Sequence, residues 1–141
     1  MEYVKTAFGY QVRLETGEEI HKSLSKLMDL LNLQGGIAMG IGALSSYSLG
    51  YYDIHKKEYI RKDYNEEVEL LSCIGNLAHK GDSKIAHLHA TVSNVNMETR
   101  GGHLFEGIIS ATGEFSLIDS KVMFKRLDGD AALPLLNLTD K

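Results

Sequence analysis

The chain has 141 residues, a formal net charge of −4 at pH 7, and contents of 43% hydrophobic and 24% charged residues. Its length fits a single domain, 1–141, and its composition is that of an ordinary globular protein. The acidic balance, in which no run of Lys or Arg exceeds two residues, argues against unaided binding to nucleic-acid phosphates.

The single cysteine, Cys73, excludes an internal disulfide framework and is typical of a reducing compartment. The N-terminus is polar, and no apolar run approaches the length of about 18 residues that a membrane-spanning helix requires. We therefore expect a cytoplasmic protein with no membrane partner.

The first elements in chain order are a strand and the one long helix. Alternating apolar and polar residues predict a strand over Tyr10–Glu15. Thr16 or the pair Glu18-Glu19 then begins a helix, and Gly35-Gly36 suits the left-handed turn that ends it. The helix is indicated by one apolar stripe at helical spacing, made of Ile20, Leu24, Leu27, Met28 and Leu31.

The rest of the chain predicts β structure. Tight turns are expected at His55–Lys57 and Lys80–Ser83, and the tail Leu133–Leu138 is too apolar to be free of packing contacts. The expected strands, besides the one that holds His87, are Ile37–Leu44, Tyr47–Ile54, Glu58–Tyr64, Val68–Leu77, Phe105–Ile109, Glu114–Ile118 and Val122–Phe124. This pattern predicts an α+β fold with a mainly antiparallel sheet, one main helix and short helical pieces.

Three histidines gather in one stretch of this β-rich region. On a strand, His87 and His89 lie on the same face, roughly 7 Å apart. His103 follows the pair Gly101-Gly102, whose small size lets the backbone pass close by, and the loop Asn94–Arg100 can turn the chain back. The opposite face of the histidine strand is apolar and suited to a core, with Ala86, Leu88, Ala90 and Val92.

Three imidazoles and an open position are the usual ligand set of a catalytic zinc ion. His87, His89 and His103 are therefore predicted metal ligands, with zinc the first choice among divalent ions. A bound metal would lower the pKa of a water molecule or polarise a carbonyl group. The alternative is that the histidines are solvated or hydrogen-bonded within the protein.

Two registers of the strand before the histidines are open. In one register Cys73 lies opposite His89 and could be a fourth ligand, and in the other Asn76 faces His87. A lone cysteine in an apolar run is more often a core residue. His79 is expected to be exposed, and His21 and His55 have no assigned role.

Three carboxylates are candidates for a general base: Glu69, Glu98 and Glu106. Glu69 is the main candidate catalytic residue because it interrupts an apolar strand, where an unpaired carboxylate is costly to bury. An ion pair at the sheet edge is the alternative for Glu69. Glu66 and Glu67 are interpreted as the solvated entrance to that strand.

The spacing from Gly81 to His87 and His89 also matches the opening of a cupin metal motif. A cupin would place a Glu three or four residues after the second His, where this chain has Ser93 and Asn94. The helix over Ile20–Leu31 does not suit a cupin either. This interpretation is therefore disfavoured.

The order of motifs along nearly the whole chain resembles the PPC domain family (plants and prokaryotes conserved) in its stand-alone prokaryotic form. The landmarks are Gly17–Glu19, Gly40–Leu44, Glu69–Asn76, His87–Ala90, Gly101–Leu104 and Glu114-Phe115. The resemblance implies an antiparallel sheet flanked by helices and assembled as a homotrimer, with the histidines at or near a subunit interface.

In plants, this domain follows AT-hook motifs that bind DNA, and this chain has no Arg-Gly-Arg-Pro core. The plant motif Gly-Arg-Phe-Glu-Ile-Leu, which recruits nuclear proteins, corresponds to Glu66–Leu71, where Glu66 and Glu67 replace the Gly and the Arg. The resemblance also carries the label of predicted DNA-binding protein, which the composition does not support.

Three functions follow as hypotheses. The first is a homotrimer with a histidine-lined metal or small-ligand site, with its status as an enzyme open. The second is a DNA-associated transcription scaffold, and the third is a purely structural oligomerisation module. For a trimer, we expect Ile37–Leu44 and Leu135–Leu138 to contribute to packing or assembly.

Overall fold

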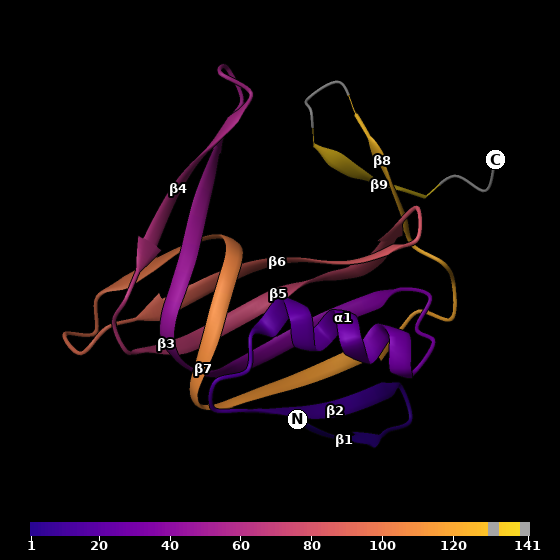
Figure 1. Cartoon of the computed structure of the whole chain (residues 1–141), viewed down its shortest axis with the longest axis horizontal. Helices are drawn as coiled ribbons and strands as arrows, with labels where there is room; N and C mark the ends of the chain where they lie inside the picture. The colour runs from indigo at the N-terminus through magenta and orange to yellow at the C-terminus, as the bar shows by residue number, and fades with distance from the viewer. Residues whose placement is uncertain (130–132, 139–141) are drawn as a thin grey trace.

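The computed structural model describes residues 1–129 and 133–138, and in these ranges it has one helix among nine strands (Figure 1). The predicted α+β class with a mainly antiparallel sheet is confirmed, although the described residues contain no further helical pieces. The elements are β1 (Glu2–Lys5), β2 (Gly9–Glu15), α1 (Ile20–Leu30), β3 (Gly36–Asp53), β4 (Glu58–Tyr64), β5 (Val68–Lys80), β6 (Ser83–Ser93), β7 (Thr99–Asp119), β8 (Lys125–Asp128) and β9 (Pro134–Asn137).

Helix α1 has a polar cap at its N-terminal end and a left-handed turn after its C-terminal end. The side chain of Glu19 accepts hydrogen bonds from the backbone N–H groups of His21 and Lys22, so the acidic pair and not Thr16 caps the helix. At the other end, Asn32 has a φ of 52° and makes the left-handed turn predicted for Gly35-Gly36. Asn tolerates this conformation because its short polar side chain can bond locally.

The apolar stripe of α1 packs against one face of the sheet. The side chains of Ile20, Leu24, Leu27 and Met28 are fully buried and join a core that includes Leu44, Leu88, Leu104 and Phe115. Leu31, which was expected in the stripe, is only partly buried at the cap. Removal of this apolar surface from water is the main stabilising contribution to the fold.

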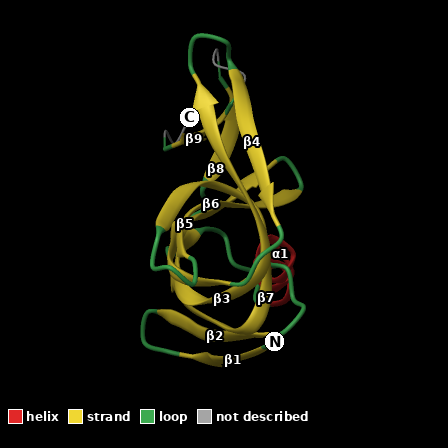
Figure 2. Ribbon diagram, turned by 90° about the vertical axis from the view of Figure 1, so that its left-hand side faces the viewer, coloured by secondary structure: helices red, strands yellow, loops and turns green. Residues whose placement is uncertain are grey.

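Four long strands close into a ring around this core. Strand β3 pairs with β5 and β7, and β6 also pairs with β5 and β7, so the sheet returns on itself (Figure 2). Strands β1 and β2 extend the sheet from the C-terminal half of β7. The β3–β4 and β8–β9 hairpins project from the ring on the side opposite β1 (Figure 1).

Two pairs of predicted strands are each one long strand. Ile37–Leu44 and Tyr47–Ile54 form the 18-residue β3, while Phe105–Ile109 and Glu114–Ile118 form the 21-residue β7. Register shifts between Gly42 and Leu44, and again between Leu44 and Ser46, bend the β3–β7 pair without ending either strand. Strand β7 therefore continues through Ser110–Gly113, between the two expected strands.

The two predicted tight turns are confirmed. Residues 54–57 connect β3 to β4, and Gly81, with a φ of 57°, lies in the turn that connects β5 to β6. The predicted strand Val122–Phe124 is wrong, because pairing begins only at Lys125. The apolar tail does pack as expected, since β9 pairs antiparallel with β8.

The outer face of the sheet is unusually apolar. We call this set the outer apolar face: Ile37, Met39, Ile41, Leu71, Ile74 and Ile118, which are each exposed by more than a third. Along Ile37–Leu44 the side chains alternate, with Ala38 inside and its neighbours outside. No helix in the described ranges is long and apolar enough to cross a membrane.

Candidate metal centre

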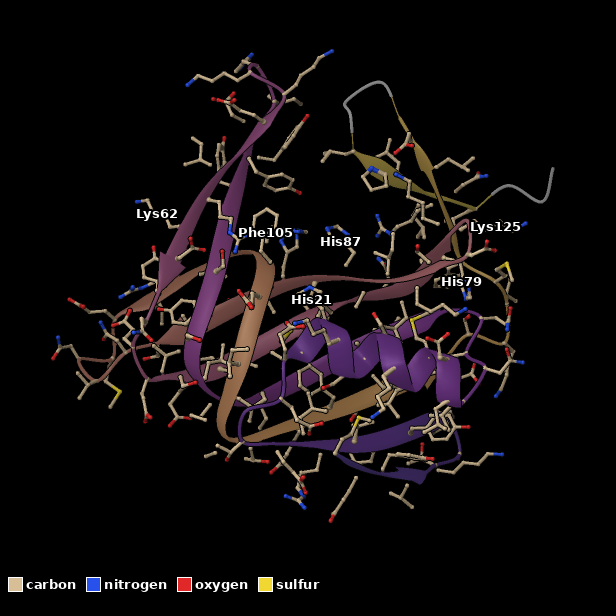
Figure 3. The ribbon with its side chains drawn as sticks, viewed as in Figure 1. His21, Lys62, His79, His87, Phe105 and Lys125 are labelled. Carbon is tan, nitrogen blue, oxygen red and sulfur yellow. The ribbon has the colours of Figure 1, made fainter. Side chains whose placement is uncertain are left out.

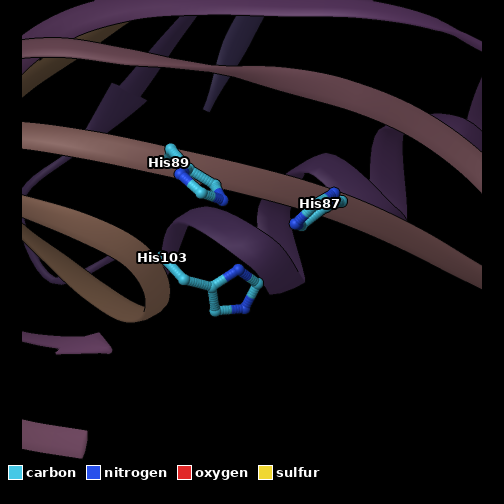
Figure 4. Close-up of side chains that lie close together, drawn as sticks. All are labelled: His87, His89 and His103. Atoms are coloured by element: carbon cyan, nitrogen blue, oxygen red, sulfur yellow. The ribbon is translucent and has the colours of Figure 1, made fainter. Parts of the chain in front are cut away.

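Two neighbouring strands carry the three histidines (Figure 4). His87 and His89 lie on β6, and His103 on β7 lies directly opposite His89. Residues directly opposite each other in antiparallel strands present their side chains on the same face. The connection between Ser93 and Thr99 turns the chain back, as expected, and this pairing brings the third imidazole to the first two.

The register of β5 decides between the two alternatives that the sequence leaves open. Asn76 lies opposite His87, whereas Cys73 lies opposite Ala90. Cys73 is fully buried in the core, and burial raises the pKa of its thiol to about 12. Cys73 is therefore a core residue and does not join the histidines.

The three imidazoles form a compact cluster. One possible ligand nitrogen from each ring lies within 4.8 Å of the other two. The ring centroids are separated by 5.3 Å for His87–His89, 5.0 Å for His87–His103 and 5.5 Å for His89–His103. Tetrahedral zinc requires nitrogen atoms separated by about 3.3 Å, so small ring rotations would bring the atoms around one ion.

Two of the histidines are held in the neutral form that binds metals. Burial, with the nearby Arg126 guanidinium and His89, lowers the pKa of His87 to about 4. Burial, with the neighbouring His87 and His89, lowers the pKa of His103 to about 4. His103 Nδ1 is buried, and the described residues offer it no hydrogen-bond partner. An available lone pair on a neutral imidazole fits a metal-ligand role.

Glycines allow the strands around the cluster to approach each other closely. A Cβ atom at Gly102 would lie 2.7 Å from the carbonyl oxygen of Gly50, as the expected role of the Gly101-Gly102 pair requires. Sequence reasoning missed Gly75, where a Cβ atom would lie only 1.8 Å from the carbonyl oxygen of His87. Both positions therefore demand glycine for steric reasons.

A cavity of about 320 Å³ opens beside the cluster. His87 and His103 lie in its wall with His21, Tyr59, Phe105 and Arg126, and residues 133–135 of the C-terminal segment complete it. Figure 3 shows His21 at the start of α1 on the same side as His87 and Phe105. The ring centroid of His103 is 4.7 Å from that of Phe105 and 5.0 Å from that of Tyr59.

Arg126 is the charged residue of this cavity. It is only 6% exposed, and burial lowers the pKa of its guanidinium. Nη1 donates to the carbonyl oxygen of Pro134 at 2.6 Å, and Nη2 donates to Asn76 Oδ1 at 2.7 Å and to His87 Nδ1 at 2.9 Å. The bonds of Nη2 fasten the β8–β9 hairpin to β5 and to the histidine strand β6.

Sequence reasoning missed Arg126 and left His21 without a role. His21 lies in the cavity wall, with Nδ1 3.3 Å from Glu19 Oε1. The only local signal for Arg126 is its place in the cation pair Lys125-Arg126, between the apolar Phe124 and Leu127, and this signal is weak. His79 was expected to be exposed but is buried, with Nε2 3.1 Å from the carbonyl oxygen of Leu33.

The carboxylates proposed as general bases do not join the cluster. Glu69 is exposed and lies between Ala43 and Ser93 on the neighbouring strands. Glu98 Oε2 accepts a hydrogen bond from Asn94, and Glu106 lies 3.9 Å from Arg61. The cavity wall contains no acidic side chain among the described residues.

Glu66 and His55 lie elsewhere. Glu66 was interpreted as solvated, but its Oε1 accepts hydrogen bonds from Arg100 Nη1 at 2.7 Å and from the Tyr47 hydroxyl at 2.9 Å. His55 lies in the turn between β3 and β4, where its backbone N–H donates to Asp53. Neither residue contributes to the histidine cavity.

Solved structures share this fold over almost the entire chain. A predicted DNA-binding protein from Ralstonia eutropha JMP134 is 26% identical, with a TM-score of 0.91 and coverage of 97% of this chain and 96% of that one. A metal-containing protein from Archaeoglobus fulgidus is 28% identical, with a TM-score of 0.84 and coverage of 97% and 99%.

Sequence comparison extends the likeness to a longer protein. The chain is 33% identical over 113 residues to a Bifunctional protein GlmU of a Synechococcus strain. The match covers 79% of this chain but only 17% of that protein. A family model for the Plants and Prokaryotes Conserved (PCC) domain matches residues 1–120. The chain therefore belongs to the PCC domain family, as the order of its motifs predicted.

Proposed function

We propose that this protein binds one divalent metal ion through His87, His89 and His103 and uses it to hold a small ligand. The convergence of three possible ligand nitrogens within 4.8 Å is the observation that supports this function best. The neutral state of His87 and His103 and the unpartnered Nδ1 of His103 add independent support. The relative from Archaeoglobus fulgidus, described as metal-containing, supports it further.

Zinc is the metal that fits this donor set best. Three imidazoles leave a fourth tetrahedral position open, which is the arrangement of catalytic zinc sites. The adjoining cavity gives that position room for a water molecule or a ligand atom. Imidazole also suits nickel, copper and iron, so metal analysis must cover all four elements.

Metal content measured on protein purified without a histidine tag tests this function. We expect close to one equivalent of metal per chain in the wild type and little in a His87→Ala/His89→Ala variant. A His55→Ala variant is the matched control, because His55 lies in the distant β3–β4 turn. Equal metal content in the wild type and the double variant would contradict the proposal.

We also propose that the protein assembles as a homotrimer through the outer apolar face. Large contiguous apolar patches on a protein surface mark interaction surfaces, and this face exposes six large apolar side chains. Met39 lies opposite Ile74, and Ile74 lies opposite His89, so the face continues up to the histidine cluster. Assembly through this face would place the cluster at or near the subunit interface.

A DNA-associated role is the second candidate, because the relative from Ralstonia eutropha JMP134 is described as a predicted DNA-binding protein. The net charge of −4 weighs against it. Titration of an AT-rich duplex at low salt tests it directly. Binding that weakens steeply as salt is added would support the DNA role, and no binding at low salt would remove it.

A further inference from the structure

The guanidinium of Arg126 is a buried cation whose described partners are all neutral. It donates to a backbone carbonyl group, to the amide oxygen of Asn76 and to the imidazole of His87. Its Nε is buried, and the described residues give it no hydrogen-bond partner. Buried charges in proteins are normally paired, because an uncompensated ion is costly to desolvate.

A metal ion at the histidines would increase this positive charge. The proposed ligands are three uncharged imidazoles, and the described wall of the cavity holds no carboxylate. A divalent cation and Arg126 would then face the same cavity without a counter-charge from these residues. An anion bound between them would relieve the repulsion.

Metal binding would also release a donor of Arg126. A neutral imidazole has one lone pair, and Nδ1 of His87 uses it to accept from Arg126 Nη2. A metal on Nδ1 would displace Arg126, and a metal on Nε2 would leave the proton on Nδ1. In either case the hydrogen bond ends. Nη2 and the unpartnered Nε lie on one edge of the planar guanidinium, which is an edge that binds carboxylates side-on.

Apart from His21, the rest of the cavity wall is mostly apolar. Tyr59 and Phe105 form one part of its wall, Ile85 and Leu104 another, and Leu133 and Leu135 of the C-terminal segment cover it. A volume of about 320 Å³ is at the lower end of the range for small-molecule sites. Such a space suits a compact aliphatic or aromatic group with one anionic end.

We infer that the cavity binds a small monocarboxylate with an apolar body, whose carboxylate bridges Arg126 and the metal on the histidine cluster. This inference rests on the proposed metal site and specifies its ligand class. The carboxylate supplies the missing negative charge and accepts from the donors that metal binding releases. The body of the ligand packs against Phe105 and Tyr59, next to His103.

Benzoate is a suitable probe, and benzamide is its neutral counterpart of nearly equal shape. We expect zinc-loaded wild-type protein to bind benzoate at least about tenfold more tightly than benzamide by calorimetry. This preference should disappear in Arg126→Gln and be partly retained in Arg126→Lys, which keeps the charge but loses the planar fork. Melting curves of both variants check that they fold, and inorganic phosphate serves as a competitor.

Equal affinities for benzoate and benzamide, or a full benzoate preference in Arg126→Gln, would overturn the inference. Benzoate displaced fully by equimolar phosphate would assign the site to inorganic anions and would also overturn it. Zinc content, measured on the same samples, separates the two proposals. Protein that holds zinc but not benzoate refutes only the ligand class, whereas protein that holds no zinc refutes the metal site and the ligand class together.

Discussion

Nη2 of Arg126 lies 2.9 Å from Nδ1 of His87, and this contact joins the C-terminal hairpin to the histidine cluster. Arginine can only donate, so Nδ1 of His87 is the acceptor, and the neutral ring carries its proton on Nε2. The contact thus fixes the tautomer of one proposed metal ligand. It also opposes metal binding, which requires this hydrogen bond to end.

This opposition predicts that removing the cation strengthens metal binding. In Arg126→Met the side chain keeps an unbranched apolar stem but loses its charge and its donors. We expect zinc to bind about tenfold more tightly to this variant than to the wild type without added anion, within the usual range of coupling between neighbouring sites. Competition with a chromogenic chelator measures the change. Unchanged or weaker zinc binding would show that Arg126 does not oppose the metal.

The lowered pKa values of His87 and His103 predict a loss of stability in acid. Both values are about 4 in the folded protein, compared with an ordinary value of 6.5, so the fold favours the neutral rings. Burial of the two neutral rings costs no protonation energy above pH 6.5. As the pH falls towards 4, the unfolded chain takes up protons that the folded protein does not, so the free energy of unfolding decreases. Urea unfolding of metal-free protein across this range measures the loss.

Replacement of both rings provides the control for this pH dependence. A His87→Gln/His103→Gln variant lacks the two titrating groups but keeps every carboxylate. We expect its stability to fall less steeply between pH 6.5 and 4 than that of the wild type. Parallel curves for the two proteins would mean that other groups cause the acid sensitivity.

The outer apolar face predicts that one charge disrupts assembly. Ile74 is 50% exposed at the centre of three strands of this face, since it lies opposite both Met39 and His89. We expect Ile74→Glu to convert the trimer to a monomer, measured as mass by light scattering. Val95→Glu is the matched control, because Val95 is exposed in the β6–β7 turn. A wild-type protein that is already monomeric would refute the proposed assembly.

The close approach of β5 and β6 predicts that any side chain at position 75 destabilises the fold. A Cβ atom there would lie 1.8 Å from the carbonyl oxygen of His87, and backbone atoms cannot move apart without breaking the β5–β6 pairing. We expect Gly75→Ala to lower the free energy of unfolding by about 1–3 kcal/mol, as overpacking does. Ser72→Ala, on the exposed face of the same strand, should change it little. Similar stabilities for the two variants would contradict this account of the packing.

Local patterns in the sequence predicted much of the fold. The stripe from Ile20 to Met28 and the alternation from Ala86 to Val92 indicated the helix and the buried face of β6, because each periodicity reflects burial of one side. The sequence predicted two strands in place of β3 and two in place of β7, because each of these strands continues through bulges. A bulge has the small residues of a turn, but it only bends the pair, and sequence alone does not distinguish them.

The part of the candidate site that was predicted has local signals in the sequence. His87 and His89 share a strand face by spacing, and His103 has an adjacent glycine pair as its signal. Arg126 and His21 reach the cavity from β8 and from the start of α1, which only long-range pairing brings together. The choice between Asn76 and Cys73 depended on a register that a one-residue slip would reverse.

Zinc titration of metal-free protein tests the central claim most directly. Calorimetry at pH 7 should give one tight site per chain in the wild type. The same titration should show no tight site in the His87→Ala/His89→Ala variant and an unchanged site in His55→Ala. A wild-type protein that binds no zinc, or a double variant that binds it as tightly as the wild type, would contradict the assignment of His87, His89 and His103 as a metal centre.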